Sequence, residues 1–242
     1  MRDFDMGRVP AVSFGADRIR DVAGIAAGLG DGPVLIVADA FLAENGVTGR
    51  LCDDFAARGV TAEVAADIVG EPKERLIDDL SDRARAAGAV VVIGLGGGAA
   101  MDAAKLVAAI ARSGRPARDF ALAASPFPAD AIPAIAIPTT AGTGSEVTRT
   151  SIVSSEDGTK KWFWGEELMF SHAVLDPALT LSLPPHLTAW TGIDAVAHAL
   201  EASTARTSSE AGRLYGLQAL RMLAEALPRA SMSAPSITAR GS

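Results

Sequence analysis

The chain has 242 residues, of which 49% are hydrophobic and 21% are charged, proportions that are ordinary for a globular protein with a sizeable core. Its formal net charge of -7 argues against a nucleic acid or an anionic membrane surface as partner, because both repel an acidic protein. The single cysteine, Cys52, excludes an internal disulfide and fits a reducing compartment.

The N-terminal stretch "MRDFDMGRVP" lacks the apolar core of a signal peptide. No apolar run in the sequence approaches the roughly 20 residues that a membrane-spanning helix needs. We therefore expect a soluble, cytoplasmic protein with no membrane partner.

Short apolar runs alternate with longer helical patterns over the first three quarters of the chain. Strands are expected at 33–39, 61–67, 89–98, 131–140 and 173–177, and helices at 49–59, 72–88 and 99–114. Pro133 and Pro138 limit the run 131–140 to a short or edge strand. Fully apolar strands that alternate with helices predict an α/β fold with a mostly parallel sheet covered on both faces.

After Pro184 only helical patterns remain, so we place a domain boundary near residues 180–184. This predicts an α/β domain over 1–182 and the start of a helical domain over 183–230. Residues 231–242, which are small and polar without an apolar stripe, are expected to form a disordered or aberrant tail.

The segment "GLGGGAAMDAAKL" (94–106) follows an apolar strand and opens a helix. In this context glycines let a phosphate approach backbone N–H groups at the positive end of the helix dipole. A strand-to-helix corner also uses glycine simply to reach positive φ, but three in a row exceed that need. We place Asp102 in the first helical turn, where the dipole alone favours an acid, and take Lys105 as an ordinary solvated residue.

A second polar turn, "PTTAGTGSEVT" (138–148), also follows an apolar run. The hydroxyl groups of Thr139, Thr140, Thr143 and Ser145 could bind a diphosphate and a ribose without adding charge. The same composition is typical of an ordinary loop. Two such turns at strand ends of one parallel sheet nevertheless predict a nucleotide site there.

The segment "TGIDAVAHALEAS" (191–203) places Asp194 and His198 four residues apart on an expected helix. Residues at that spacing have Cβ atoms about 5–6 Å apart, close enough to share a metal ion. Both lie on the shoulder of an apolar stripe. The alternative is structural: Thr191 and Asp194 fit a helix-capping pattern, and His198 could be a half-buried core residue.

Together with "LDPALTLSLPP" (175–185), these three segments resemble the iron-containing, or group III, alcohol dehydrogenases, and they occur in that family's order. The resemblance implies a dehydroquinate synthase-like fold: an N-terminal Rossmann-like nucleotide-binding domain with a parallel sheet, followed by an all-helical domain that is incomplete here. It also implies NAD and Fe²⁺ (or Zn²⁺) as cofactors, and a small alcohol or aldehyde as substrate. Alanine-rich helical surfaces suggest a homodimer.

The resemblance also implies which residues contact the coenzyme: Asp39, Gly97, Gly98, Asp102, Thr139, Thr140, Thr143, Ser145 and Lys161. Asp39 would bind the adenosine ribose, where an acid favours NAD by repelling the 2′-phosphate of NADP. Lys161, with Lys160 as the fallback, would lie near the nicotinamide ribose. The sequence departs from the family at Ala99, where serine is usual, and at Glu71, where asparagine is expected.

By the same resemblance, Asp194 and His198 would be metal ligands at the catalytic centre. The family completes this site with two further histidines, expected after residue 230, and the sequence does not contain them. His172 and His186 lie outside any ligand-bearing motif. Two protein ligands fall short of the three that a catalytic zinc site normally has, so our hypothesis is a reading frame that has been cut short.

Three functions follow from these observations. The first is a metal-dependent oxidoreductase that transfers hydride between NAD(H) and an alcohol or aldehyde. The second is a catalytically incomplete nucleotide-binding chain. The third is a fold relative such as dehydroquinate synthase, maleylacetate reductase or glycerol-1-phosphate dehydrogenase.

Overall fold

The structure is a computed structural model that describes residues 3–4 and 7–233. The chain divides into two compact units. The α/β unit comprises Val9–Thr139 and Ser145–Ala178. The helical unit comprises Thr140–Gly144, the described residues from Leu179 onward, and the described N-terminal residues up to Arg8. Our expected boundary between residues 182 and 183 stays a prediction.

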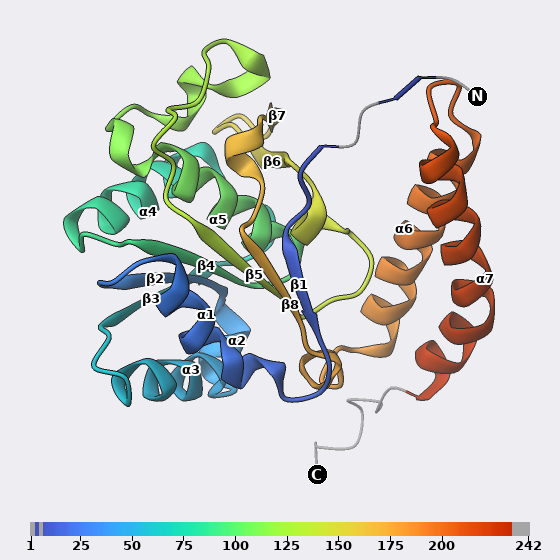
Figure 1. The fold of residues 1–242 in the computed structure, drawn as a ribbon, viewed down its shortest axis with the longest axis horizontal. Coiled ribbons are helices and arrows are strands. Elements are labelled where there is room, and N and C mark those ends of the chain that lie inside the picture. Colours follow the sequence, from blue (N-terminus) through green and yellow to red (C-terminus); the bar gives the residue numbers. More distant parts are fainter. Residues whose placement is uncertain (1–2, 5–6, 234–242) are drawn as a thin grey trace. The chain divides into compact units, whose positions relative to one another are not determined.

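The α/β unit is built on one parallel sheet in the order β1-β8-β5-β4-β2-β3 (Figure 1). Its strands are β1 (Ala11–Phe14), β2 (Val34–Asp39), β3 (Ala62–Ile68), β4 (Val91–Gly96), β5 (Ala134–Pro138) and β8 (His172–Leu175). All pairings between these strands are parallel. The parallel sheet expected from the apolar runs is therefore confirmed, whereas β1 escaped prediction because most of its side chains are exposed.

Strand β5 lies inside the sheet, between β4 and β8, and has only five residues, so of the two expected alternatives, a short or an edge strand, the first is confirmed. The two prolines stand at its ends: Pro133 precedes the strand and Pro138 closes it. The strand is short, as those prolines require, but its missing N–H groups do not fall in its middle.

Helices cover both faces of the sheet (Figure 1). On one face are α1 (Val22–Leu29) and α3 (Val47–Ala56), and on the other α4 (Glu74–Ala86) and α5 (Gly98–Ile110). The short α2 (Ala40–Glu44) continues directly from β2. Single 3-10 turns lie in this unit at Arg18–Asp21, Ala111–Ser113, Ala117–Asp119, Ala121–Ala123, Ser145–Val147 and Glu166–Leu168, and one more, Pro177–Thr180, runs from this unit into the helical one.

The core lies between the central strands and α5, nearly all of whose residues are buried. Leu35 and Val92 face this helix from the sheet. Gly94 of β4 has no side chain there, and an added Cβ would stand 2.9 Å from that of Ala104. The glycine therefore lets α5 approach the sheet closely, and burial of each large aliphatic side chain contributes about 1.5–3 kcal/mol.

An antiparallel hairpin, β6 (Thr150–Ser154) and β7 (Lys160–Trp164), forms a second small sheet. It was not predicted from the sequence. In β7 Phe163 is buried while Trp162 and Trp164 are exposed, which is the two-residue alternation of a strand with one covered face.

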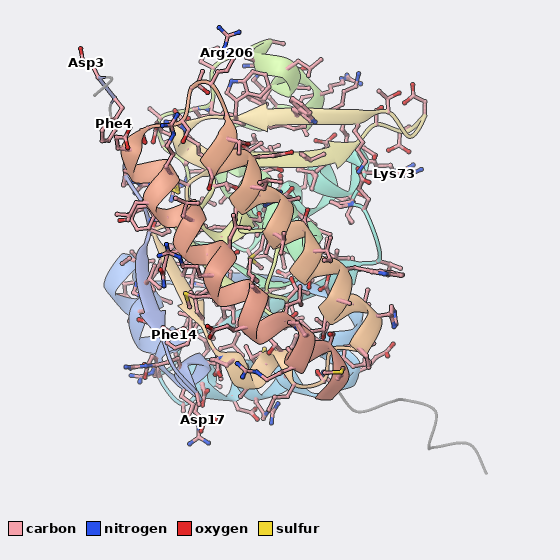
Figure 2. All side chains as sticks on the ribbon, turned by 90° about the vertical axis from the view of Figure 1, so that its right-hand side faces the viewer. Asp3, Phe4, Phe14, Asp17, Lys73 and Arg206 are labelled. Carbon is pink, nitrogen blue, oxygen red and sulfur yellow. The ribbon has the colours of Figure 1, made fainter. Side chains whose placement is uncertain are left out.

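The helical unit contains α6 (Pro185–Thr204) and α7 (Glu210–Ser233), which pack side by side (Figures 1 and 2). Gly192 of α6 faces the side chain of Leu227, where any Cβ would clash. Helix α7 continues to Ser233, so the first three residues of the tail expected from residue 231 are helical and not disordered; the rest of that prediction lies outside the described residues. Among the helices of the described chain, none has the length and apolar character needed to cross a bilayer.

Candidate functional site

The carboxyl end of β4 turns into α5 through Gly96 and Gly97. Gly96 has a φ of 148°, a conformation that residues with a side chain rarely adopt, and a Cβ there would clash with the carboxylate of Asp39. Gly97 precedes the first helical residue, and no side chain caps the helix. The first N–H groups of α5, beginning with that of Gly98, have no acceptor within the helix. They lie at the positive end of the helix dipole, so the turn suits an anion.

Asp39 ends the neighbouring strand β2, and its Oδ2 accepts the backbone N–H of Gly97 at 2.8 Å. Burial raises the pKa of the Asp39 carboxyl, and the hydrogen bond from Gly97 acts in the opposite direction. The carboxylate therefore holds the backbone of the glycine turn. Its contact with a ribose stays a prediction.

Asp102 lies in the second turn of α5, because the helix begins at Gly98; the first-turn placement is wrong, and no acidic residue occupies that turn. Asp102 Oδ1 accepts the hydroxyl of Ser145 at 2.6 Å, and Oδ2 accepts the N–H of Ile152 at 2.8 Å. Burial raises the pKa of Asp102, while nearby Lys105 lowers it. These contacts tie α5 to the start of the hairpin.

Lys105 is buried, with 1% of its surface exposed, so its interpretation as a solvated residue is wrong. Its Nζ donates to Ser145 Oγ at 2.8 Å, Thr148 Oγ1 at 3.0 Å and the carbonyl of Thr150 at 2.7 Å, and it lies 3.7 Å from Asp102 Oδ1. Burial lowers the pKa of Lys105 to about 8, against the opposing effect of Asp102. The available signal was that residues 98–110 are apolar around the whole helix, which leaves a lone lysine no solvent-facing side.

The hydroxyl residues of the second polar turn are divided between the two units. Thr139 is buried in the α/β unit, where its N–H donates to the carbonyl of Gly96 at 2.9 Å. Ser145 belongs to the same unit, whereas Thr140 and Thr143 belong to the helical unit. The structure thus brings Thr139 and Ser145 to the β4–α5 region; the coenzyme contacts of all four residues stay predictions.

Lys161 lies in β7 opposite Val153 and is half-buried. Lys160, the fallback candidate, is exposed and forms an ion pair with Glu71, Nζ to Oε2 at 3.1 Å. The other oxygen of Glu71 accepts the hydroxyl of Ser154 at 2.8 Å, and this bond is the main cause of the lowered pKa of Glu71. Glu71, a departure from the family pattern, is therefore bound to the hairpin that carries both lysines.

Asp194 and His198 lie on one side of α6, with Oδ1 3.6 Å from Nε2, and about half of each side chain is exposed. The capping alternative for this segment is wrong, because α6 begins at Pro185 and Thr191 lies inside it, donating its hydroxyl to the carbonyl of Leu187 at 2.9 Å. The pair therefore leaves a carboxylate and an imidazole half-exposed on one side of α6.

A carboxylate and an imidazole are donors that iron(II) and zinc accept in proteins. Within residues 3–4 and 7–233, however, no group of three or more His, Cys, Asp or Glu side chains could hold a metal ion. The Asp194–His198 pair therefore fits such an ion in the kind of its donors and falls short in their number.

Comparisons with known proteins agree with one another. The sequence profile described as "Iron-containing alcohol dehydrogenase" matches residues 10–177. The chain is 32% identical over 234 residues to the sulfoacetaldehyde reductase of Bilophila wadsworthia, and 35% identical over 204 residues to long-chain-alcohol dehydrogenase 1 of Geobacillus thermodenitrificans. The crystal structure of the sulfoacetaldehyde reductase from Bifidobacterium kashiwanohense in complex with NAD+ matches with a TM-score of 0.90 at 30% identity.

These matches take in most of this chain and only part of each relative. The two sequence relatives are covered to 60% and 51% of their lengths, against 96% and 84% of this chain. The solved structure is covered to 62% of its length, against 96% of this chain. The chain thus spans half to three fifths of the length of these relatives. The expected fold, a parallel-sheet domain followed by part of a helical domain, is confirmed.

Proposed function

Because this chain belongs to the iron-containing alcohol dehydrogenases, we propose that it serves hydride transfer between NAD(H) and a small alcohol or aldehyde. The observation that carries the proposal is the β4–α5 turn, where Gly96 and Gly97 bring bare backbone to the positive end of α5. NAD(H) carries the hydride in this chemistry, and the protein supplies binding and orientation.

Support for a dinucleotide comes from the fit between the turn and a diphosphate. The first amides of α5 can donate to phosphate oxygens, and the absence of a Cβ at Gly96 lets the Asp39 carboxylate lie against the turn. Asp39, next to the turn, adds a negative charge that a 2′-phosphate would meet. We therefore propose NAD rather than NADP as the coenzyme, bound by the predicted domain 1–182, with Lys161 near the nicotinamide ribose.

Asp194 and His198 are the residues that we propose as ligands of a divalent metal, Fe²⁺ or Zn²⁺, in the predicted helical domain. Such an ion, when bound, would supply Lewis-acid polarisation of the substrate oxygen. Two ligands are fewer than the three usual for a catalytic zinc site, so these residues contribute to the site without completing it. The homodimer and the cytoplasmic location stay predictions.

The proposal is tested by titrating the purified chain with NADH and comparing Gly96→Ala with Gly49→Ala. An alanine methyl at residue 96 would meet the Asp39 carboxylate in a strained backbone conformation, whereas Gly49 lies in α3 with open space around it. Strain of about 1–3 kcal/mol should weaken NADH binding by about fivefold to about a hundredfold in Gly96→Ala, whereas Gly49→Ala should bind NADH as the unaltered chain does. Equal affinities in all three proteins, or no NADH binding by the unaltered chain, would overturn the proposal.

A second candidate, nucleotide binding without turnover, is favoured by the two-donor set at Asp194 and His198. It predicts that the chain binds NADH yet oxidises none of it with short aldehydes, even after Fe²⁺ or Zn²⁺ is added. Measurable metal-dependent turnover would exclude this candidate.

A further inference from the structure

The chain passes from one unit to the other at several points. At three of these points, a hydrogen bond within the α/β unit holds the chain. The crossings follow Thr139, precede Ser145 and follow Ala178. The N–H of Thr139 donates to Gly96, and the N–H of Ala178 donates to the buried carboxylate of Asp176 at 3.0 Å. Ser145 is anchored differently, because its side chain bonds to both a carboxylate and an ammonium, those of Asp102 and Lys105.

Two residues of α5 that carry opposite charges hold Ser145. Its hydroxyl donates to Asp102 at 2.6 Å, and its oxygen accepts from the ammonium of Lys105 at 2.8 Å. The same ammonium reaches Thr148 and the carbonyl of Thr150. One buried cation therefore binds the whole segment 145–150 to the helix that begins at the glycine turn.

The surroundings of Lys105 explain how an ammonium is tolerated there. Removing an unpaired charge from water is very costly, so a buried ammonium needs acceptors and an opposite charge. Lys105 has three acceptors, and Asp102 and Glu146 favour its charged form. The ring of Phe170 lies 5.7 Å from Nζ. Because all three N–H groups of the ammonium donate to protein acceptors, none is left to bind a ligand.

We propose that Lys105 is a positioning residue: it fixes the segment Ser145–Thr150 on α5 and so holds the part of the predicted coenzyme site that belongs to the α/β unit. Asp102 and Ser145 contribute to the same arrangement, because the Ser145 hydroxyl bonds to both Asp102 and Lys105. The proposal rests on the proposed function only for its coenzyme readout.

Lys105→Met tests the proposal, because methionine keeps an unbranched apolar chain and removes every donor. Backbone amides of residues 145–152 should exchange hydrogen about tenfold faster or more, while those of β2 and β4 keep their protection. The dissociation constant for NADH should rise about tenfold through loss of charge-assisted hydrogen bonds. The matched control is Lys73→Met, an exposed lysine at the start of α4 (Figure 2), which should change neither quantity.

A double-mutant cycle separates positioning from general loosening. If Lys105 acts through Ser145, Ser145→Ala should weaken NADH binding by itself, and adding it to Lys105→Met should cost little more. Additive losses would overturn the proposal, as would unchanged exchange at 145–152 in a folded Lys105→Met protein.

If Lys105→Met does not fold, Ser145→Ala and Thr148→Val each remove one acceptor and should each speed exchange over 145–152; unchanged exchange in both overturns the proposal. Absence of NADH binding by the unaltered chain would refute the proposed function alone, since hydrogen exchange still decides the role of Lys105.

Discussion

The β4–α5 turn and the Asp194–His198 pair differ in how much of each site is held by bonds within the described chain. At the turn, Asp39 and Thr139 bind the glycine backbone directly. On α6, a carboxylate and an imidazole stand 3.6 Å apart, half exposed, without a third donor group among the described residues. A phosphate site can be built from backbone N–H groups of one turn, whereas a metal site needs several side chains brought together, so the first kind needs only one short segment of the chain.

The largest expected effect is a change of stability with pH, which arises from the lowered pKa of Lys105 in the α/β unit. Its pKa is lowered from 10.5 to about 8 in the folded protein, so between these pH values the unfolded chain binds more protons. The free energy of unfolding should therefore rise with pH across that window, by up to about 3 kcal/mol at 1.36 kcal/mol per pKa unit. Urea unfolding at pH 7.5 and 10 measures the rise.

Lys105→Met should lack this particular rise, since methionine does not titrate, while Lys73→Met should retain it. The prediction fails if the unaltered protein and Lys105→Met show the same dependence of stability on pH. Such a result would mean that the ammonium is solvated in the folded protein and that its hydrogen bonds do not hold the segment 145–150 to α5.

The next largest effect concerns Asp39, which braces the turn. Asp39→Ala removes the acceptor of the Gly97 N–H, and a hydrogen bond to a charged group contributes about 1.5–3 kcal/mol. NADH binding should weaken by roughly tenfold or more, and the preference for NADH over NADPH should shrink because the negative charge is gone. Titration with both coenzymes measures the two effects.

Asp31→Ala, which removes an exposed acid just before β2, is the control and should leave both affinities unchanged. A fall in NADH affinity with an unaltered preference between the coenzymes would show that Asp39 acts on the turn alone and does not meet the ribose.

Sequence reasoning reached those parts of the fold and site that are local. Strands β2 and β4 were predicted because their apolar runs are continuous, and the glycine turn because it directly follows one of them. Strand β1 and the β6–β7 hairpin were missed because exposed or alternating residues hide them from a search for apolar runs.

The misread residues depend on partners distant in sequence. Asp39 was placed correctly at a strand end, but its partner Gly97 is 58 residues away. Lys105 was misread because its three acceptors lie 40 to 45 residues further along the chain, in a turn and hairpin whose packing the sequence does not display. Composition marks a residue as polar, and only the folded chain shows which group it faces.

The smallest expected effect tests the other side of the comparison, on α6. Asp194→Ala and His198→Ala each remove one of two candidate donors, so Zn²⁺ affinity, measured by calorimetry on the whole chain, should fall at least about tenfold for either variant, because even losing a residue that only orients a metal ligand costs about that much. NADH affinity should not change, because neither Asp194 nor His198 is among the predicted coenzyme contacts. His186→Ala, which removes an imidazole near the start of the same helix, is the control and should leave both affinities unchanged. Equal Zn²⁺ binding by all four proteins would show that the pair is not a metal-ligand set, and the contrast between a bonded coenzyme turn and a partial metal site would have to be given up.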